Sequence, residues 1–326
     1  MLRLGLDIGG TKMEGLLLDG EGNELCRRRI ATPQQGYQTF IEVVTGFIRG
    51  FAEEAGAPVS IGIGLPGAVR ADNGCIKNAN CLFLNGHPLK ADLEAALGQP
   101  VWLANDADCF TLSEAVDGAG SGANLVFGVI LGTGCGGGIV AHQRLLVGPN
   151  AITGEWGHNP LPGYDPVRDG PAQPCYCGRS NCIERFVSGT GFAGRFVERH
   201  GRSLSPKGIL TAAAEGDGEA QAHYDHFLHA LGRSLASVIN LLDPDVIVFG
   251  GGLSNIARLY EDLPAAITPW LFTDSCLTRL LPARPGCLTP DLTLSPHYPY
   301  TEPAAPWGSP LPAAALSTAA GPFLPR

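Results

Sequence analysis

A carboxylate follows an apolar strand in the segment VWLANDAD, where Asn105 and Asp106 are expected to leave the strand and enter a loop facing a cleft. Such a carboxylate can act as general base and take the proton of a hydroxyl that attacks a γ-phosphate. Asp108 is the competing base, and it is expected either to point away or to cap a helix over about 109–115. The segment therefore predicts phosphoryl transfer with Asp106 as the base.

The opening motif DIGGTK has the residue types of a phosphate loop. Asp7 ends a strand, and Gly9 and Gly10 are expected to take the positive φ of a tight turn whose backbone amides attract anions. Asp7 would hold Mg2+ through water, and Thr11 would donate to a phosphate oxygen, with Lys12 beside it. An ordinary hairpin turn is the alternative, but the flanking Asp, Thr and Lys favour phosphate.

Two further glycine segments resemble ligand loops. Gly132, Gly134 and Gly137 in GTGCGGG have the spacing of a dinucleotide fingerprint, but a strand follows where that fingerprint needs a helix. A second phosphate-cradling hairpin, with Thr133 at its tip, is the better interpretation, and a glycine turn without a ligand is the alternative. Gly250–Gly252 ends a buried strand and is expected to contact adenosine, although a glycine turn after a core strand needs no ligand.

A metal site is indicated by His158, Cys175, Cys177 and Cys182, which supply one imidazole and three thiols. This Cys3His set suits tetrahedral Zn2+ and leaves no position for water, so the ion would be structural. The alternative is three unrelated thiols and a hydrogen-bonded histidine.

Two glutamates flank the predicted metal ligands. Glu155 precedes His158 by three residues, and Glu184 follows Cys182 by two, so a bound ion would orient both carboxylates toward sugar hydroxyls. Each taken alone could be a solvated surface charge. That plain interpretation is preferred for the helical histidines that have no thiol partner, namely His223, His226 and His229.

These residues are carried by an alternation of strands and helices. A strand meander opens the chain, a helical pattern covers 38–55, and the apolar strand VSIGIGLPG follows. The meander pattern returns at 124–148, ahead of a helix over 219–242 and the strand DVIVFGGG. The pattern predicts a duplicated α/β architecture with a cleft between its halves. A Pro- and Ala-rich tail without period follows Arg284.

Composition excludes several classes of protein. The net charge is -9 and the lysines are scattered, which argues against a nucleic-acid partner. No apolar run is long enough to span a membrane, and no signal peptide is evident, so we expect a cytoplasmic protein without membrane contact. The ten cysteines are accordingly expected to be reduced thiols.

Taken in order, the segments DIGGTK, GIGLPG, LANDAD, GTGCGGG, GEWGHNPLP, CYCGRSNCIE and IVFGGGLSN resemble the ROK family of sugar kinases and sugar-responsive repressors, over about residues 3 to 284. The resemblance implies an α/β, actin-like (RNase H-like) two-domain ATPase fold that closes around sugar and ATP with Mg2+. We place the domains at 1–118 and 119–284, with an atypical tail over 285–326. A repressor would also need a DNA-reading module, for which the chain leaves no room before its phosphate loop. A homodimer is expected from the same resemblance.

The resemblance also implies roles for individual residues. Asp106 is the base, and His158 would serve zinc through one ring nitrogen and sugar through the other. The other implied sugar contacts are Gly67, Asn80, Asn105, Glu155 and Glu184. The segments KNANCLFLNGHPL and CYCGRSNCIERFVSGTGF are most similar to the fructokinase and mannokinase type. This similarity predicts transfer to the 6-hydroxyl of fructose, with mannose or glucose as further acceptors. N-acetylglucosamine kinase and glucokinase of the same family are the alternatives.

Two positions depart from the family pattern. Asn181 stands where the cysteine motif has its last glycine, and it should keep the turn because Asn tolerates left-handed φ. After Arg284 the chain reads RPGCLTPDLTLSP in place of an H-G-D segment and a closing helix. This break suggests a frameshifted or replaced terminus.

Overall fold

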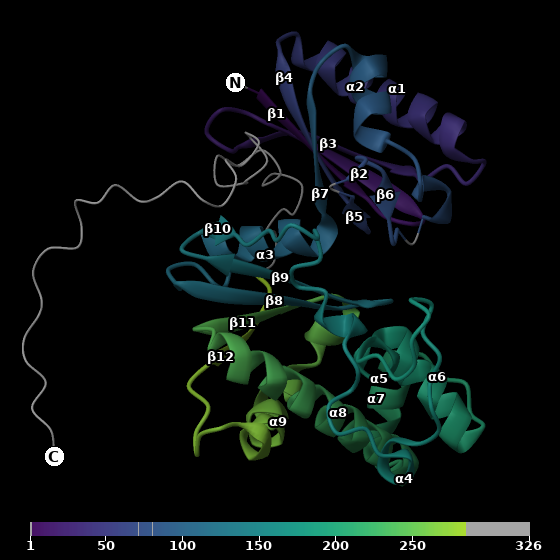
Figure 1. Ribbon diagram of the computed structural model, residues 1–326, viewed down its shortest axis with the longest axis vertical. Coiled ribbons are helices and arrows are strands. Elements are labelled where there is room, and N and C mark those ends of the chain that lie inside the picture. The colour runs from purple at the N-terminus through teal and green to yellow at the C-terminus, as the bar shows by residue number, and fades with distance from the viewer. Residues whose placement is uncertain (1, 71, 80, 285–326) are drawn as a thin grey trace, which may run out of the picture.

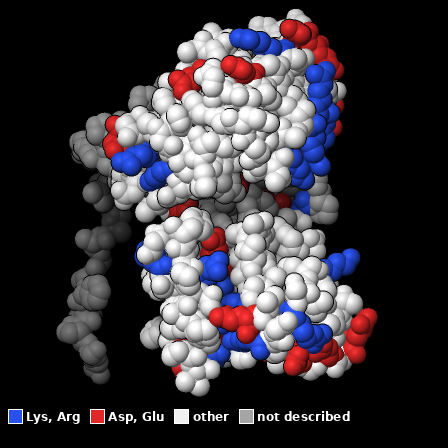
Figure 2. Space-filling view, turned by 90° about the vertical axis from the view of Figure 1, so that its right-hand side faces the viewer, with Lys and Arg blue, Asp and Glu red and all other residues white. Residues whose placement is uncertain are grey.

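A computed structural model of the chain describes residues 2–70, 72–79 and 81–284. The predicted tail over 285–326 lies outside the described residues, and so does Asn80. Two lobes lie one above the other, each built on a five-stranded sheet (Figure 1). Between the lobes the surface narrows to a waist at which acidic side chains are visible (Figure 2).

The first sheet has the strand order β3-β2-β1-β4-β7. Its strands and the adjoining short ribbon are β1 (Leu2–Ile8), β2 (Lys12–Leu18), β3 (Glu24–Ala31), β4 (Val59–Leu65), β5 (Ala68–Val69), β6 (Ile76–Lys77) and β7 (Val101–Asn105). The first three strands are antiparallel, as the predicted meander requires, and β4 and β7 join parallel to β1. Helices α1 (Tyr37–Ala55) and α2 (Leu89–Leu97) cover this sheet, and a short 3-10 turn covers Leu82–Leu84.

The second sheet repeats this topology in the order β10-β9-β8-β11-β12. Its strands are β8 (Leu125–Leu131), β9 (Cys135–Ala141), β10 (Arg144–Leu145), β11 (Val246–Gly250) and β12 (Arg279–Pro282). Again a meander comes first and two parallel strands follow. The predicted duplication is therefore present in the strand order of the two sheets.

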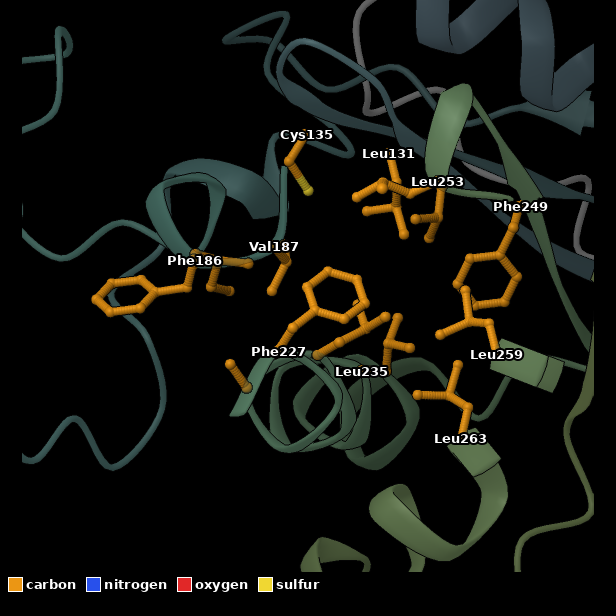
Figure 3. Packing of buried hydrophobic residues seen from close by; sticks show 14 of the residues in the cluster. Leu131, Cys135, Phe186, Val187, Phe227, Leu235, Phe249, Leu253, Leu259 and Leu263 are labelled. Atoms are coloured by element: carbon orange, nitrogen blue, oxygen red, sulfur yellow. The ribbon is translucent and has the colours of Figure 1, made fainter. Parts of the chain in front are cut away.

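The helices of the second lobe lie mainly on the side away from the first lobe (Figure 1). They are α4 (Pro166–Asp169), α5 (Glu184–Val187), α6 (Gly189–His200), α7 (Pro206–Ala214), α8 (Gly218–Leu242) and α9 (Ala257–Ile267). Short 3-10 turns cover Trp156–His158, Gly252–Asn255 and Thr268–Trp270. Leu131 and Phe249 of the sheet meet Phe227 and Leu235 of α8 and Leu263 of α9 in one buried cluster (Figure 3).

Helix α3 (Asp106–Val116) follows β7 directly and packs on the near face of the second sheet. The helix can pack closely on the sheet because Gly128 and Gly138, which pair across β8 and β9, have no side chains. A Cβ on either glycine would lie 2.0 or 2.5 Å from the Thr111 hydroxyl oxygen. This helix joins the two lobes, and the domain boundary at residue 118 stays a prediction.

The predicted helices over 38–55 and 219–242 correspond to α1 and α8. The expectation of a loop after β7 was wrong, because α3 begins at Asp106 without an intervening loop. The expected solvent exposure was wrong for His223, whose buried Nε2 lies 2.8 Å from the Phe192 carbonyl oxygen. No helix among the described residues is both long and apolar enough to cross a bilayer.

Candidate active site and metal centre

Asp106 is the first residue of α3, and the side chain of Asn105 holds it there. The Asn105 Oδ1 accepts hydrogen bonds from the backbone N–H groups of Ala107 and Asp108, at 2.8 and 3.2 Å. Its Nδ2 donates to the Gly67 carbonyl oxygen at 3.0 Å. Asn105, rather than Asp108, is therefore the cap of this helix, which corrects the expected start of the helix at residue 109.

Gly67 lies where no other residue would fit without strain. Its φ is +102°, and an added Cβ would lie 2.7 Å from the Lys77 carbonyl oxygen and 2.8 Å from the Ala79 nitrogen. The GIGLPG loop consequently presses its backbone on the segment that follows β6. Asn105 joins this loop to the start of α3, so one amide side chain sets the position of both.

The first hairpin turn is braced from the connection between β3 and α1. Gly9 donates from its backbone to the Lys12 carbonyl oxygen at 2.9 Å, and the Thr32 hydroxyl donates to the Gly9 carbonyl oxygen at 2.7 Å. The expected positive φ is wrong for Gly9 and Gly10, neither of which is among the positive-φ glycines. Gly9 is instead constrained by space, since its Cβ would lie 3.1 Å from the Lys12 carbonyl oxygen.

Two carboxylates at strand and helix ends face the same hollow. A cavity of about 160 Å³ is lined by Asp7, Asp106 and Gly251, among others. Desolvation, followed by repulsion from Asp106 and Glu14, raises the pKa of Asp7 to about 6. Burial also raises the pKa of Asp106, and the N–H of Ala107 opposes that shift. Two close carboxylates of this kind fit a divalent cation, whose charge would stabilise both anions.

A neighbouring cavity of about 280 Å³ brings together the predicted base, the second glycine turn and all of the predicted sugar contacts except Asn80, which lies outside the described residues. Its lining includes Gly67, Asn105, Asp106, Gly132, Thr133, Gly134, Glu155, His158 and Glu184. Asp7, Gly9, Gly10, Thr11, Lys12, Gly250, Gly251 and Gly252 are absent from this lining, although Asp7 and Gly251 face the 160 Å³ hollow. The sequence reasoning missed Asn78 and Tyr176, which also line the cavity.

Tight backbone packing builds the second glycine turn. The Glu184 Oε2 accepts a hydrogen bond from the Cys135 backbone N–H at 2.9 Å, and a Cβ on Gly134 would lie 2.7 Å from the same oxygen. The Trp156 Nε1 donates to the Gly136 carbonyl oxygen at 3.0 Å. Glycine is needed here because the turn is pressed between two side chains.

The other glutamate that lines the cavity is Glu155, half-buried at the start of the Trp156–His158 turn. Burial raises its pKa, the charge of His158 opposes the shift, and repulsion from Asp106 and Glu184 adds to it. Three carboxylates therefore surround the cavity. Such acceptors suit a ligand rich in hydroxyl donors.

The four predicted metal ligands lie together, with ligand atoms all within 4.8 Å of one another. The Cys175 Sγ is 3.6 Å from the His158 Nδ1, and the Cys177 Sγ is 3.5 Å from the Cys182 Sγ. Tetrahedral Zn–S bonds of about 2.3 Å would put two sulfur atoms ~3.8 Å apart, so the donor set fits such an ion. Asn181 has a φ of +58°, the left-handed conformation expected of the residue that stands in place of glycine in this turn.

The second ring nitrogen of His158 is engaged as well. Its Nε2 lies 2.9 Å from the Tyr176 hydroxyl oxygen, and the Tyr176 side chain is otherwise exposed. A sugar hydroxyl that reaches this nitrogen must displace or share that hydroxyl. The position of Tyr176 between Cys175 and Cys177 was the sequence signal that could have placed it in this cavity.

Comparison with known proteins places these features in one family. The family model described as "ROK family" matches residues 3–286. N-acetyl-D-glucosamine kinase of Vibrio cholerae is 35% identical over 285 residues, which cover 86% of this chain and 94% of the relative. The N-acetyl-D-glucosamine kinase of Salmonella paratyphi B is 39% identical over 81% of this chain and 90% of the relative, and that of Yersinia pseudotuberculosis is 37% identical over 86% and 94%.

Solved structures agree with the fold. The ROK hexokinase of Thermus thermophilus superimposes with a TM-score of 0.78 and 30% identity, covering 90% of this chain and 97% of that one. A ROK glucokinase from Streptomyces griseus, in complex with glucose and AMPPNP, gives 0.72 and 28% over 90% and 97%. These are sugar kinases of the actin-like ATPase fold, so the expected fold is confirmed.

The relatives also correct one expectation. The prediction of a fructokinase was wrong, because the curated relatives at 35 to 39% identity are N-acetyl-D-glucosamine kinases. Short segments such as CYCGRSNCIE shape the metal loop and the turn after it, and they carried the fructokinase assignment without reporting on the whole sugar pocket. With a matching family model, fold and site, the chain belongs to the ROK family, as a sugar kinase that transfers phosphate to an alcohol group.

Proposed function

We propose that the protein is an ATP-dependent N-acetyl-D-glucosamine kinase. The observation that carries the proposal is that Asp106, the second glycine turn and three further polar residues line one cavity, namely Glu155, His158 and Glu184. The identity of the relatives supplies the sugar, since those relatives are kinases of N-acetyl-D-glucosamine. The earlier alternative of a glucokinase has less support.

In the proposed reaction, Asp106 accepts the proton of the attacking sugar hydroxyl. It is suited to this because its carboxylate faces the cavity and its raised pKa makes it a better proton acceptor than an exposed aspartate. Asn105 acts as a positioning residue through its bonds to the helix start and to Gly67. Glu155 and Glu184 accept hydrogen bonds from other sugar hydroxyls, and His158 contributes its Nε2.

The nucleotide would lie between the two hairpin turns. The turn at Gly132–Gly134 lines the cavity beside Asp106, and its backbone would approach the phosphates. Gly251, with φ of +82°, borders the adjoining hollow and would face the adenosine side. Asp7 would hold Mg2+ through water, and this ion would supply charge neutralisation for the transferred phosphoryl group. The first turn, from Gly9 to Lys12, would contact the phosphates from the other lobe.

Structural zinc is part of the proposal. His158, Cys175, Cys177 and Cys182 would hold the ion, and its effect would be to fix the loop that carries His158 and precedes Glu184. A homodimer and a cytoplasmic location remain predictions.

The decisive experiment is a coupled ADP-release assay with purified protein, ATP and Mg2+. N-acetyl-D-glucosamine is expected to give the highest kcat/KM when compared with glucose, mannose and fructose. No turnover of N-acetyl-D-glucosamine, together with turnover of any other sugar in the panel, would refute the assignment. No turnover of any of the four sugars, from protein that melts cooperatively, would refute it as well.

A further inference from the structure

A small recess opens beside the proposed sugar site and is not used by the mechanism above. Its volume is about 40 Å³. Gly67, Asn105 and Glu155 line both the recess and the larger cavity, so the two spaces adjoin at residues proposed to contact sugar. The recess extends between the loop after β4 and the segment that follows β10.

The walls of the recess are mostly apolar. Leu65, Val69 and Leu103 come from the first lobe, and Leu146 and Val147 come from the second. Apolar walls of this kind favour a methyl or methylene group over water. Because the walls come from both lobes, the shape of the recess depends on how the lobes meet.

The carboxyl group of Asp108 lines the recess in addition to that of Glu155. Asp108 lines the recess from the first turn of α3, and its Oδ1 is buried without a hydrogen-bond partner. Leaving a buried polar atom unpaired costs about 1–3 kcal/mol, so an unpaired carboxyl oxygen beside a ligand site points to a bond formed with that ligand.

The surroundings of Asp108 also set its protonation state. Burial, followed by repulsion from Glu155 and Asp106, raises the pKa of Asp108 to about 8. Below that pH the group is mainly a neutral carboxylic acid, which can donate one hydrogen bond as well as accept.

The size of the recess limits its occupant. A buried water needs about 10–15 Å³ by the same measure, so 40 Å³ holds about three non-hydrogen atoms. An acetyl group attached to nitrogen has three such atoms: the carbonyl carbon, its oxygen and the methyl carbon. A sugar hydroxyl has one and would leave most of the apolar space to water.

We propose that this recess is an acyl subsite that receives the 2-acetamido group of the sugar, with Asp108 as the residue that hydrogen-bonds to its amide. The methyl group packs on the apolar side chains, and Asp108 selects for the amide against a hydroxyl. This inference rests on the proposed function, because it assumes that N-acetyl-D-glucosamine is the substrate.

The first test compares kcat/KM for N-acetyl-D-glucosamine with that for glucose, or with the inhibition constant of glucose if it is not turned over. Asp108→Ala is expected to lower the preference for the acetamido sugar about 10- to 100-fold. Ala68→Leu, which fills the recess, should also lower this preference. Asp108→Asn keeps a hydrogen-bond donor and an acceptor, so it should lower the preference less than Asp108→Ala does. Asp225→Ala, an exposed aspartate on α8, is the control. An unchanged preference in both Asp108→Ala and Ala68→Leu would overturn the proposal.

The second test uses the unmodified enzyme and so does not depend on any variant folding. N-butanoyl-D-glucosamine carries two more carbon atoms than the recess can hold, and its kcat/KM should be at least about 10-fold below that of the N-acetyl sugar. Equal values would overturn the subsite. If the enzyme turns over N-acetyl-D-glucosamine and yet fails these tests, the subsite is wrong and the kinase assignment stands. Absence of that turnover is the separate failure of the assignment.

Discussion

Replacing Asn105 by alanine is expected to weaken both the fold and the catalysis. The substitution removes two cap bonds to the start of α3 and the bond from Nδ2 to the Gly67 carbonyl oxygen. The cap contributes about 1 kcal/mol, and the partly buried bond to Gly67 contributes about 1 kcal/mol more. We therefore expect the free energy of unfolding to fall by about 2 kcal/mol, or the Tm by about 4–8 °C.

The same change should lower kcat, because Asp106 is the residue next to the lost cap. A displacement of about 1 Å at the base can cost ~100-fold in rate, so we expect kcat to fall about 10- to 100-fold. Thermal unfolding gives the stability change, and the ADP-release assay gives kcat. Asn105→Ser keeps a capping oxygen and loses the donor to Gly67, so it should lose about half as much stability.

A matched control is available at Asn240 of α8, which lines none of the cavities described above. Asn240 also uses both ends of its amide, donating to the Trp270 carbonyl oxygen at 2.9 Å and accepting from the Phe272 N–H at 3.0 Å. Asn240→Ala should reduce stability and leave kcat unchanged. If Asn105→Ala keeps kcat within twofold, or lowers it no more than Asn240→Ala does, the positioning role is refuted.

Three other predictions follow from the same geometry. Asp106→Asn should lower kcat by about 10²- to 10⁴-fold while calorimetry still detects sugar binding, and unchanged kcat would move the base elsewhere. Burial raises the pKa of Asp106, and the pKa of Asp7 is about 6 against 3.8 for a free carboxyl. Because both groups must be anions, activity should be present above pH 6 and lost as the pH falls through about 6. Excess Mg2+ stabilises the anions and should move this loss of activity to lower pH. A limb near pH 4 that ignores Mg2+ would contradict this. Cys177→Ser should reduce the bound zinc, measured by mass spectrometry, and lower the Tm. The control variant Cys276→Ser should leave both unchanged. Purified protein that holds no zinc, together with a Tm that Cys177→Ser does not alter, would rule out the structural ion.

The sequence by itself determined the parts of this protein that depend on neighbouring residues. The strand meander, its recurrence at 124–148, the glycine turns and the long helix over 219–242 all follow from local periodicity and turn chemistry. The metal ligands were predictable for the same reason, because the three cysteines lie within eight positions of one another. Asn181 kept the left-handed turn, as its side chain allows.

Packing across the chain decided the rest. The start of α3 at Asp106 depends on the Asn105 amide, which is held by the distant Gly67 carbonyl. The burial of His223, and the placement of Asp108 in a recess walled by both lobes, likewise depend on residues remote in sequence. Local sequence patterns determine where a strand or a turn forms. The solvent exposure and the partners of a side chain depend instead on the elements that pack against it. The choice between hexoses lies in those contacts, which is why the motif segments favoured fructose and the whole-chain comparison corrected it.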